Sequence, residues 1–255
     1  MRITTALIFI LLFSFFATSA AADSFTALAA PYPPYSVSKG LTVKGVSVSA
    51  LNAIMEMCGT PLSDRSYKLT PWAYAYECAA RTPRQIIVNA KRTPVTEPLY
   101  KWVGPVMNSR IVLIGRRKDS LIIPFKSDLK KYRIAAVRWS RPEKTLLEGG
   151  FTKAELERTP THVKSLRMLN RGEVDLFATN ERGAPSLFEG LGLDLDDFVI
   201  CHVYEEEPLY FAFSRDTDDG LIVRLNKALR TLKSKGGSGQ SRFDRMMSAN
   251  SLSMK

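Results

Sequence analysis

The pattern of apolar and polar positions predicts alternating strands and helices along most of the chain. Apolar residues at helical spacing from Ser47 to Cys58, followed at once by Gly59, predict a helix that ends at a glycine. A later helix, Leu221–Ser234, has four leucines on one face. The other expected strands are Ser24–Ala29, Tyr67–Thr70, Ile86–Asn89, Arg110–Arg116, Tyr132–Val137, Val174–Ala178 and His202–Phe213, and the other expected helices are Pro71–Arg81, Arg141–Gly149, Ser165–Asn170 and Leu187–Leu191. Strands that alternate with helices indicate parallel sheets.

This pattern suggests two units of similar construction. It restarts near Tyr132, after the apolar run Arg110–Arg116, and the C-terminal part again has a strand followed by a helix. We therefore expect an α/β protein with two lobes, each a mostly parallel sheet flanked by helices, joined by two crossing strands. The glycine-rich stretch from Lys235 to Gly239 is expected to form a hinge before a last short helix.

The N-terminus has the pattern of a secretory signal peptide. Arg2 precedes an apolar run of about a dozen residues, and small residues then follow as far as Ala22. Ala20 and Ala22 fit a signal-peptidase site, so we expect residues 1–22 to be removed and Asp23 to begin a mature, periplasmic chain. The alternative is an uncleaved membrane anchor, but the apolar run is shorter than the ~20 residues that a spanning helix needs.

The composition is that of a globular protein with a basic surplus. Lysine and arginine number 36 against 25 acidic residues, a formal net charge of +11. This surplus favours anionic partners, or contributes only to solubility. The basic residues are spread along the chain without a nucleic-acid motif, so we expect no nucleic-acid partner. His162 and His202 lack metal-ligand spacing, so we expect no metal and no cofactor.

The three cysteines are of two kinds. Cys58 and Cys78 lie near the ends of a predicted helix–strand–helix unit, and in an exported chain they could either form a disulfide or stay free. Cys201 follows the apolar residues from Phe198 to Ile200 and is expected to be a buried thiol.

Six short motifs occur in the order typical of one protein family. They are Tyr32-Pro33-Pro34-Tyr35, Pro71-Trp72-Ala73, Arg92-Thr93-Pro94 followed by Trp102-Val103-Gly104-Pro105, the helix start Ser140–Leu147, Arg171-Gly172-Glu173-Val174-Asp175, and Glu207-Pro208-Leu209-Tyr210-Phe211-Ala212-Phe213-Ser214. Together they resemble the extracellular solute-binding proteins of family 3, the polar amino-acid receptors of ABC importers with the type II periplasmic-binding fold. The resemblance covers nearly the whole mature chain.

The resemblance implies a domain organisation and a place for the ligand. Lobe 1 would comprise residues 23–107 and 207–255, and lobe 2 residues 108–206. A small molecule would bind in the cleft between the lobes, and hinge closure would bury it. An ABC permease would be the membrane partner of a monomeric receptor.

Two charged positions of the family pattern are changed in this chain. The arginine that grips a ligand carboxylate would fall at Thr96, and the carboxylate that pairs with a ligand ammonium would fall at Asn180. Because a buried ligand charge without a partner is costly, an ordinary zwitterionic amino acid should bind weakly. Lys91, Arg92, Arg138 and Arg141 are expected substitutes, so a polar or anionic small molecule is favoured.

Each candidate ligand contact also has a purely structural alternative. The aromatic residues could be core, the cations could be solvated, and Ser140 could only cap a helix. The candidate ligand-binding residues are Tyr32, Trp72, Asn89, Lys91, Arg92, Thr93, Thr96, Arg138, Ser140, Arg141 and Asn180.

The sequence therefore favours a binding protein over an enzyme. No nucleophile and base stand in a recognisable arrangement. In a dehydratase-like enzyme on the same fold, Glu173 or His202 could transfer a proton, but neither has a recognisable partner in the sequence. A ligand-sensing partner of a membrane receptor is a further alternative, which the sequence does not separate from transport.

Overall fold

The structure is a computed structural model, and it describes residues 24–237 and 239–252. The predicted signal peptide, residues 1–22, lies outside the described residues. Among the described residues, no helix has both the length and the apolar character needed to cross a membrane.

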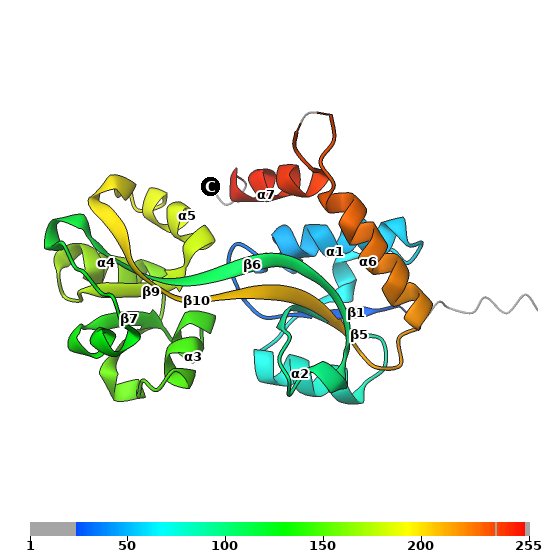
Figure 1. Ribbon diagram of the computed structural model, residues 1–255, viewed down its shortest axis with the longest axis horizontal. Helices are drawn as coiled ribbons and strands as arrows, with labels where there is room; N and C mark the ends of the chain where they lie inside the picture. Colours follow the sequence, from blue (N-terminus) through cyan, green and yellow to red (C-terminus); the bar gives the residue numbers. More distant parts are fainter. Residues whose placement is uncertain (1–23, 238, 253–255) are drawn as a thin grey trace, which may run out of the picture.

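Two lobes share one mixed sheet of eight strands, and two long strands run through both lobes (Figure 1). The strand order is β4-β1-β5-β10-β6-β9-β7-β8. The crossing strands are β6 (Lys101–Arg116) and β10 (Phe198–Phe213), which pair antiparallel along their length. The expected two-lobed α/β architecture is confirmed, whereas the predicted lobe boundaries remain a prediction.

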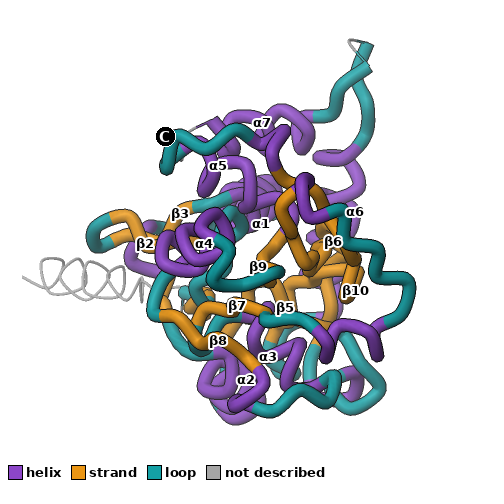
Figure 2. The backbone as a smooth tube through the Cα atoms, turned by 90° about the vertical axis from the view of Figure 1, so that its left-hand side faces the viewer, coloured by secondary structure: helices purple, strands orange, loops and turns teal. Residues whose placement is uncertain are grey.

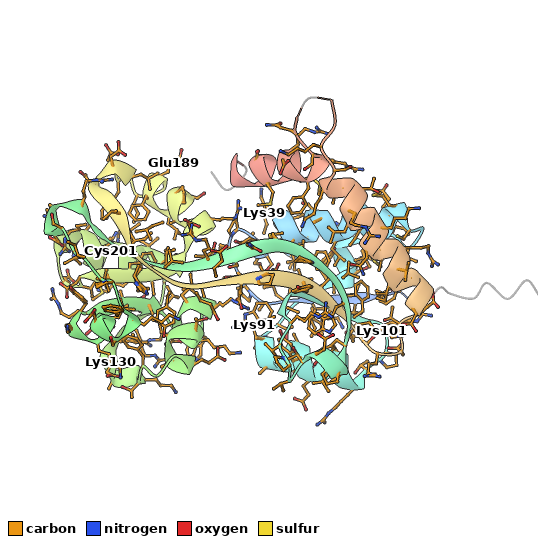
Figure 3. The ribbon with its side chains drawn as sticks, in the orientation of Figure 1. Lys39, Lys91, Lys101, Lys130, Glu189 and Cys201 are labelled. Atoms are coloured by element: carbon orange, nitrogen blue, oxygen red, sulfur yellow. The ribbon has the colours of Figure 1, made fainter. Side chains whose placement is uncertain are left out.

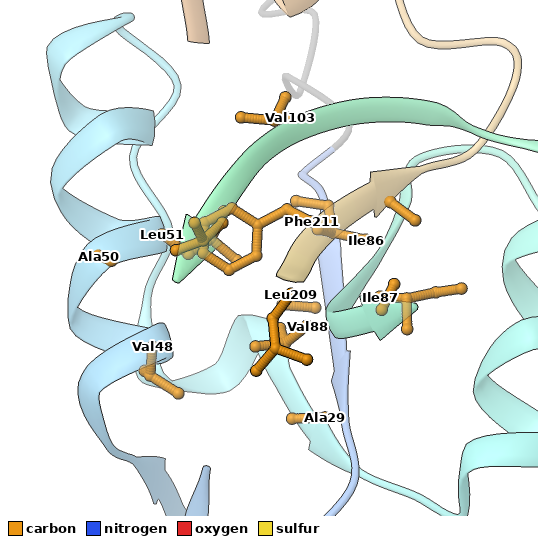
Figure 4. Packing of buried hydrophobic residues seen from close by; sticks show 14 of the residues in the cluster. Ala29, Val48, Ala50, Leu51, Ile86, Ile87, Val88, Val103, Leu209 and Phe211 are labelled. Atoms are coloured by element: carbon orange, nitrogen blue, oxygen red, sulfur yellow. The ribbon is translucent and has the colours of Figure 1, made fainter. Parts of the chain in front are cut away.

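The first lobe is built on three parallel strands. Its strands are β1 (Thr26–Ala29), β4 (Tyr67–Leu69) and β5 (Gln85–Lys91), its helices are α1 (Val46–Met57), α2 (Trp72–Arg81), α6 (Asp219–Lys233) and α7 (Arg242–Leu252), and a separate hairpin is formed by β2 (Val37–Lys39) and β3 (Thr42–Lys44). Helices α1 and α2 cover opposite faces of the sheet (Figure 1). Apolar side chains of α1, including Leu51, face Ile86 of β5 and Phe211 of β10 and form the core (Figure 4).

The second lobe repeats this construction on a smaller scale. Its strands are β7 (Ile134–Val137), β8 (Leu156–Thr159) and β9 (Leu176–Asn180), and its helices are α3 (Arg141–Glu148), α4 (His162–Arg171) and α5 (Ala184–Glu189). Strand β7 pairs parallel with both β8 and β9. Figure 2 shows these strands between α4 and α3. The prediction of parallel pairing is therefore correct for the strands β1, β4 and β5 and for β7, β8 and β9, whereas antiparallel pairing comes from the crossing strands and from the β2–β3 hairpin.

Local sequence signals set the helix ends that border the cleft. The Ser140 hydroxyl accepts a hydrogen bond of 3.3 Å from the Glu143 amide and so begins α3, as predicted. Helix α1 ends before Gly59, whose φ of +76° is in the left-handed region that favours glycine. The structure differs at α2, where Pro71 is the N-cap and Trp72 is the first helical residue.

The cysteines are free thiols in the structure, so a disulfide between Cys58 and Cys78 is not formed. The physical reason is their placement. Cys58 ends α1 on one face of the lobe 1 sheet, whereas Cys78 is on α2, which covers the other face. Cys201 is partly buried in β10, beside the second-lobe core (Figure 3).

Candidate functional site

The candidate residues gather where the parallel strands of both lobes end. Tyr32 follows β1, Lys91 ends β5, and Trp72 begins the helix after β4. From the second lobe come Arg141, at the start of the helix after β7, and Asn180, which ends β9. In α/β sheets the crevice outside the carboxyl ends of the strands is the usual place for a ligand.

Arg141 reaches from the second lobe to two aromatic rings of the first, which lie edge to face with their centroids 6.4 Å apart. Its guanidinium carbon lies 5.4 Å from the ring centroid of Tyr32 and 5.4 Å from that of Trp72. The side chain is buried and forms an ion pair with the equally buried Glu207 of β10. A guanidinium over aromatic faces and against a carboxylate is well stabilised, because both neighbours present negative potential.

Lys91 extends this arrangement into a network with two acidic residues. Its Nζ lies 2.6 Å from Glu205 Oε1 and 3.1 Å from Glu207 Oε2. Lys91 stands on the side of its lobe that faces the other lobe (Figure 3). Two cations, Lys91 and Arg141, thus meet two carboxylates, and the positive charge expected from these two residues is balanced within the protein.

Asn180 joins the two lobes at the floor of the cleft. Its Nδ2 donates to Tyr32 Oη at 3.2 Å, to Ser109 Oγ at 2.9 Å and to the Arg110 carbonyl oxygen at 3.2 Å. Tyr32 Oη and Ser109 Oγ are also hydrogen-bonded to each other. Burial is the main cause that raises the pKa of Tyr32, so its hydroxyl stays protonated. Asn180 is therefore buried, and it donates a hydrogen bond to Tyr32 of lobe 1.

Two chambers of the cleft share part of their walls, namely Trp72, Ala73 and Lys144. The first, here called the lysine chamber, has a volume of about 410 Å³. Its wall includes Trp72, Tyr76, Lys91, Thr93, Thr96, Tyr100 and Arg141. The second, here called the tryptophan chamber, has a volume of about 700 Å³. Its wall includes Pro31, Leu69, Trp72, Val137, Arg138, Trp139, Ser140, Glu143, Lys144, Leu147, Lys153, Arg158 and His162.

Thr93 and Thr96 line the lysine chamber but bond mainly to each other. Their hydroxyls are 3.0 Å apart, and the Thr96 hydroxyl donates to the Lys91 carbonyl at 3.1 Å. The family resemblance places a carboxylate-binding arginine on this loop. Here the loop instead carries two threonines whose hydroxyls bond to each other.

Two of the predicted ligand contacts, Arg92 and Asn89, bond to other residues of the protein instead. Arg92 donates to Glu97 and lies over the rings of Trp102 and Tyr210, at 5.7 and 5.5 Å from their centroids, and it lines neither chamber. Asn89 is buried, accepts from Ser47 and donates to Ser36 at 3.2 Å.

The structure also adds residues that the sequence did not suggest. Glu205 and Glu207 are the partners of Lys91 and Arg141, and Trp139 and Glu143 line the tryptophan chamber. The one available signal was the run of three acids from Glu205 to Glu207 on a strand, where charge is uncommon unless it is paired. Among the described residues, no group of His, Cys, Asp and Glu is placed to hold a metal ion.

The fold is shared with solved binding proteins at low sequence identity. No protein-family model matches the sequence, and no curated protein matches it. An amino-acid ABC transporter substrate-binding protein, AbpA of Streptococcus pneumoniae, bound to L-arginine, is 16% identical, with a TM-score of 0.67 over 91% of this chain and 97% of that one.

Two further solved structures are similar. A variant of the arginine-binding protein ArgBP of T. maritima is 16% identical, with a TM-score of 0.64 over 89% of this chain and 95% of that one. A histidine kinase sensor domain described as similar to periplasmic binding proteins is 18% identical, with a TM-score of 0.65 over 88% and 95%. The chain thus has the two-lobed periplasmic-binding-like fold that its resemblance to solute-binding family 3 implied.

Proposed function

We propose that the chain is an exported solute-binding receptor of the family 3 type, which captures a small polar or anionic molecule between its lobes for an ABC importer. The observation that carries the proposal is the cleft itself. Both lobes contribute strand ends, helix starts and side chains to two adjoining chambers, as a receptor that closes on its ligand requires.

Only some of the cations that line the cleft can attract an anionic ligand. Arg141 and Lys91 are neutralised by Glu207 and Glu205, so they do not offer a free positive site. Arg138, Lys144 and Lys153 line the tryptophan chamber and are the cations left to attract an anion. The positively charged surface of the cleft therefore lies on the second lobe.

An enzymatic role has less support from the geometry. Glu173 is exposed, 3.7 Å from Arg171, and His202 contacts the Ile123 carbonyl at 3.0 Å. Neither residue lines either chamber. Proton transfer to a bound molecule requires hydrogen-bond reach, which these positions do not have.

A sensing role is the second candidate function. The observation that favours it is the similarity to a histidine kinase sensor domain over 88% of this chain. In that case the closed receptor would be recognised by a membrane signalling protein instead of a permease.

Thermal-shift screening tests the proposed function. The chain from Asp23 would be heated with a panel of amino acids, organic acids and oligosaccharides. A ligand that binds only the folded state at one hundred times its Kd stabilises it by about 2.7 kcal/mol, so a true solute raises the midpoint as its concentration rises. A panel without any concentration-dependent shift would contradict a receptor for these classes.

A further inference from the structure

The aromatic site of the cleft is filled by the protein itself. The Arg141 guanidinium lies against the rings of Tyr32 and Trp72, and Glu207 neutralises it. The Arg141 side chain is only 9% exposed. A ligand cation or ammonium group would have to displace this buried ion pair, which makes the space beside these two rings a poor place for a solute.

The tryptophan chamber is the larger space that remains. Leu69 and Pro71 from the first lobe and Val137 and Leu147 from the second give it apolar walls, and its volume of about 700 Å³ is within the usual range for ligand pockets. Trp72 lines both this chamber and the lysine chamber. Apolar walls from both lobes favour a ligand with an apolar body.

An exposed indole lines this chamber. Trp139 is 85% exposed, which is unusual for the largest apolar side chain. Its backbone has a φ of +59°, and its amide donates to the buried carboxylate of Glu143, which also binds Arg158. A non-glycine residue held in the left-handed region points to a position that the surrounding structure imposes. The backbone of Trp139 is thus held in place, and its indole offers a flat surface on which an aromatic ring can stack.

The polar part of the chamber is positively charged. Arg138, Lys144, Lys153 and Arg158 line it, whereas Glu143 is its one carboxylate and is already bound. Among the described residues, no carboxylate pairs with Arg138 or Lys153, and Lys144 lies 3.7 Å from the exposed Glu148. An apolar ligand that carries one carboxylate would satisfy both parts of the wall.

We infer that the solute occupies the tryptophan chamber and is an aromatic carboxylate, with its ring beside Trp139 and its carboxylate near Arg138, Lys144 and Lys153. This inference rests on the proposed function and names the substrate class. It also explains how a chain with the amino-acid receptor fold can lack both charged clamps at Thr96 and Asn180.

Calorimetric titration with three simple probes tests the inference. Phenylacetate carries both the ring and the charge, acetate carries the charge alone, and 2-phenylethylamine carries the ring with the opposite charge. Phenylacetate should bind at least about tenfold more tightly than either of the other two, a difference typical of one well-placed interaction. Trp139→Ala should weaken phenylacetate by about tenfold, because it removes the stacking surface.

The matched control is Phe125→Ala. Phe125 is also an exposed aromatic residue of the second lobe, 67% exposed, and lines neither chamber. This variant should bind phenylacetate as the unaltered protein does. The inference is overturned if phenylacetate binds no better than acetate, or if Trp139→Ala binds it normally. If a different solute from the thermal-shift panel binds, the proposal of an aromatic carboxylate is wrong but the proposed receptor function stands. If no solute binds, the receptor function is contradicted as well.

Discussion

Arg141 of the second lobe and Glu207 of the crossing strand β10 form a buried ion pair, with the Arg141 guanidinium against the rings of Tyr32 and Trp72. This pair joins the lobes directly. Removal of one member of a buried ion pair leaves the other charged and desolvated, so the pair is sensitive to single substitutions.

Arg141→Ala should destabilise the protein by about 3–5 kcal/mol, because Glu207 would keep only Lys91 as a partner. Urea unfolding measures this change. Arg171→Ala is the control, since Arg171 is 70% exposed and its pair should contribute less than about 1 kcal/mol. Equal effects of the two substitutions would contradict the role given to the buried pair.

The same variant should gain a binding site. Loss of Arg141 leaves a space lined by Tyr32, Trp72 and Glu207, so free methylguanidinium or arginine should raise its melting midpoint while leaving the unaltered protein unchanged. Adding Glu207→Gln to this variant should abolish the gain. If neither compound changes the melting midpoint of a folded Arg141→Ala protein, the guanidinium does not fill a cation site.

Asn180→Asp should destabilise the protein by about 1–3 kcal/mol instead of restoring an amino-acid site. The new carboxylate would face the Arg110 carbonyl oxygen, to which Asn180 now donates at 3.2 Å, and a donor would be lost to Tyr32 and Ser109. Urea unfolding and titration with amino acids check both points. An equally stable variant that binds zwitterionic amino acids would refute this view of Asn180.

The half-buried His162 should make stability depend on pH. Burial lowers the pKa of His162 below its ordinary value of 6.5, so the unfolded chain takes up the proton first as the pH falls. The free energy of unfolding should therefore decrease as the pH drops below about 6.5. His162→Gln should show a smaller decrease than the unaltered protein between pH 7.5 and 5.5, with His202→Gln as control. Superimposable pH profiles for the unaltered protein and His162→Gln would count against a depressed pKa.

All three cysteines should react with a thiol reagent in denaturant without prior reduction, because Cys58, Cys78 and Cys201 are free. Mass spectrometry after alkylation counts the labels. A single label, with two more only after reduction, would instead demonstrate a disulfide.

Local pattern was enough to predict most of the fold. Helical spacing located α1 and α6, and the serine and proline at Ser140 and Pro142 located the start of α3. Strand β8 (Leu156–Thr159) was missed because its sequence Leu-Glu-Arg-Thr has one apolar residue. Strands β6 and β10 were expected to be shorter, since their ends are marked by pairing with each other and not by composition.

The candidate site was only partly predictable. Tyr32, Trp72, Lys91, Arg141 and Asn180 do meet in the cleft, because motif order fixed their places on the strand ends. That Arg141 would pair with Glu207 could not be foreseen, since a charge's partner depends on distant chain segments. The role of Trp139 could not be predicted either, because this exposed residue belongs to no periodic pattern of apolar positions.

The proposed receptor captures a solute and leaves it unchanged. Native mass spectrometry of the chain from Asp23, mixed with the solute that gives the largest thermal shift, tests it most directly. We expect one bound molecule per chain, with the mass of the solute added, even after prolonged incubation. Absence of the complex, or conversion of the solute into a product of different mass, would contradict it.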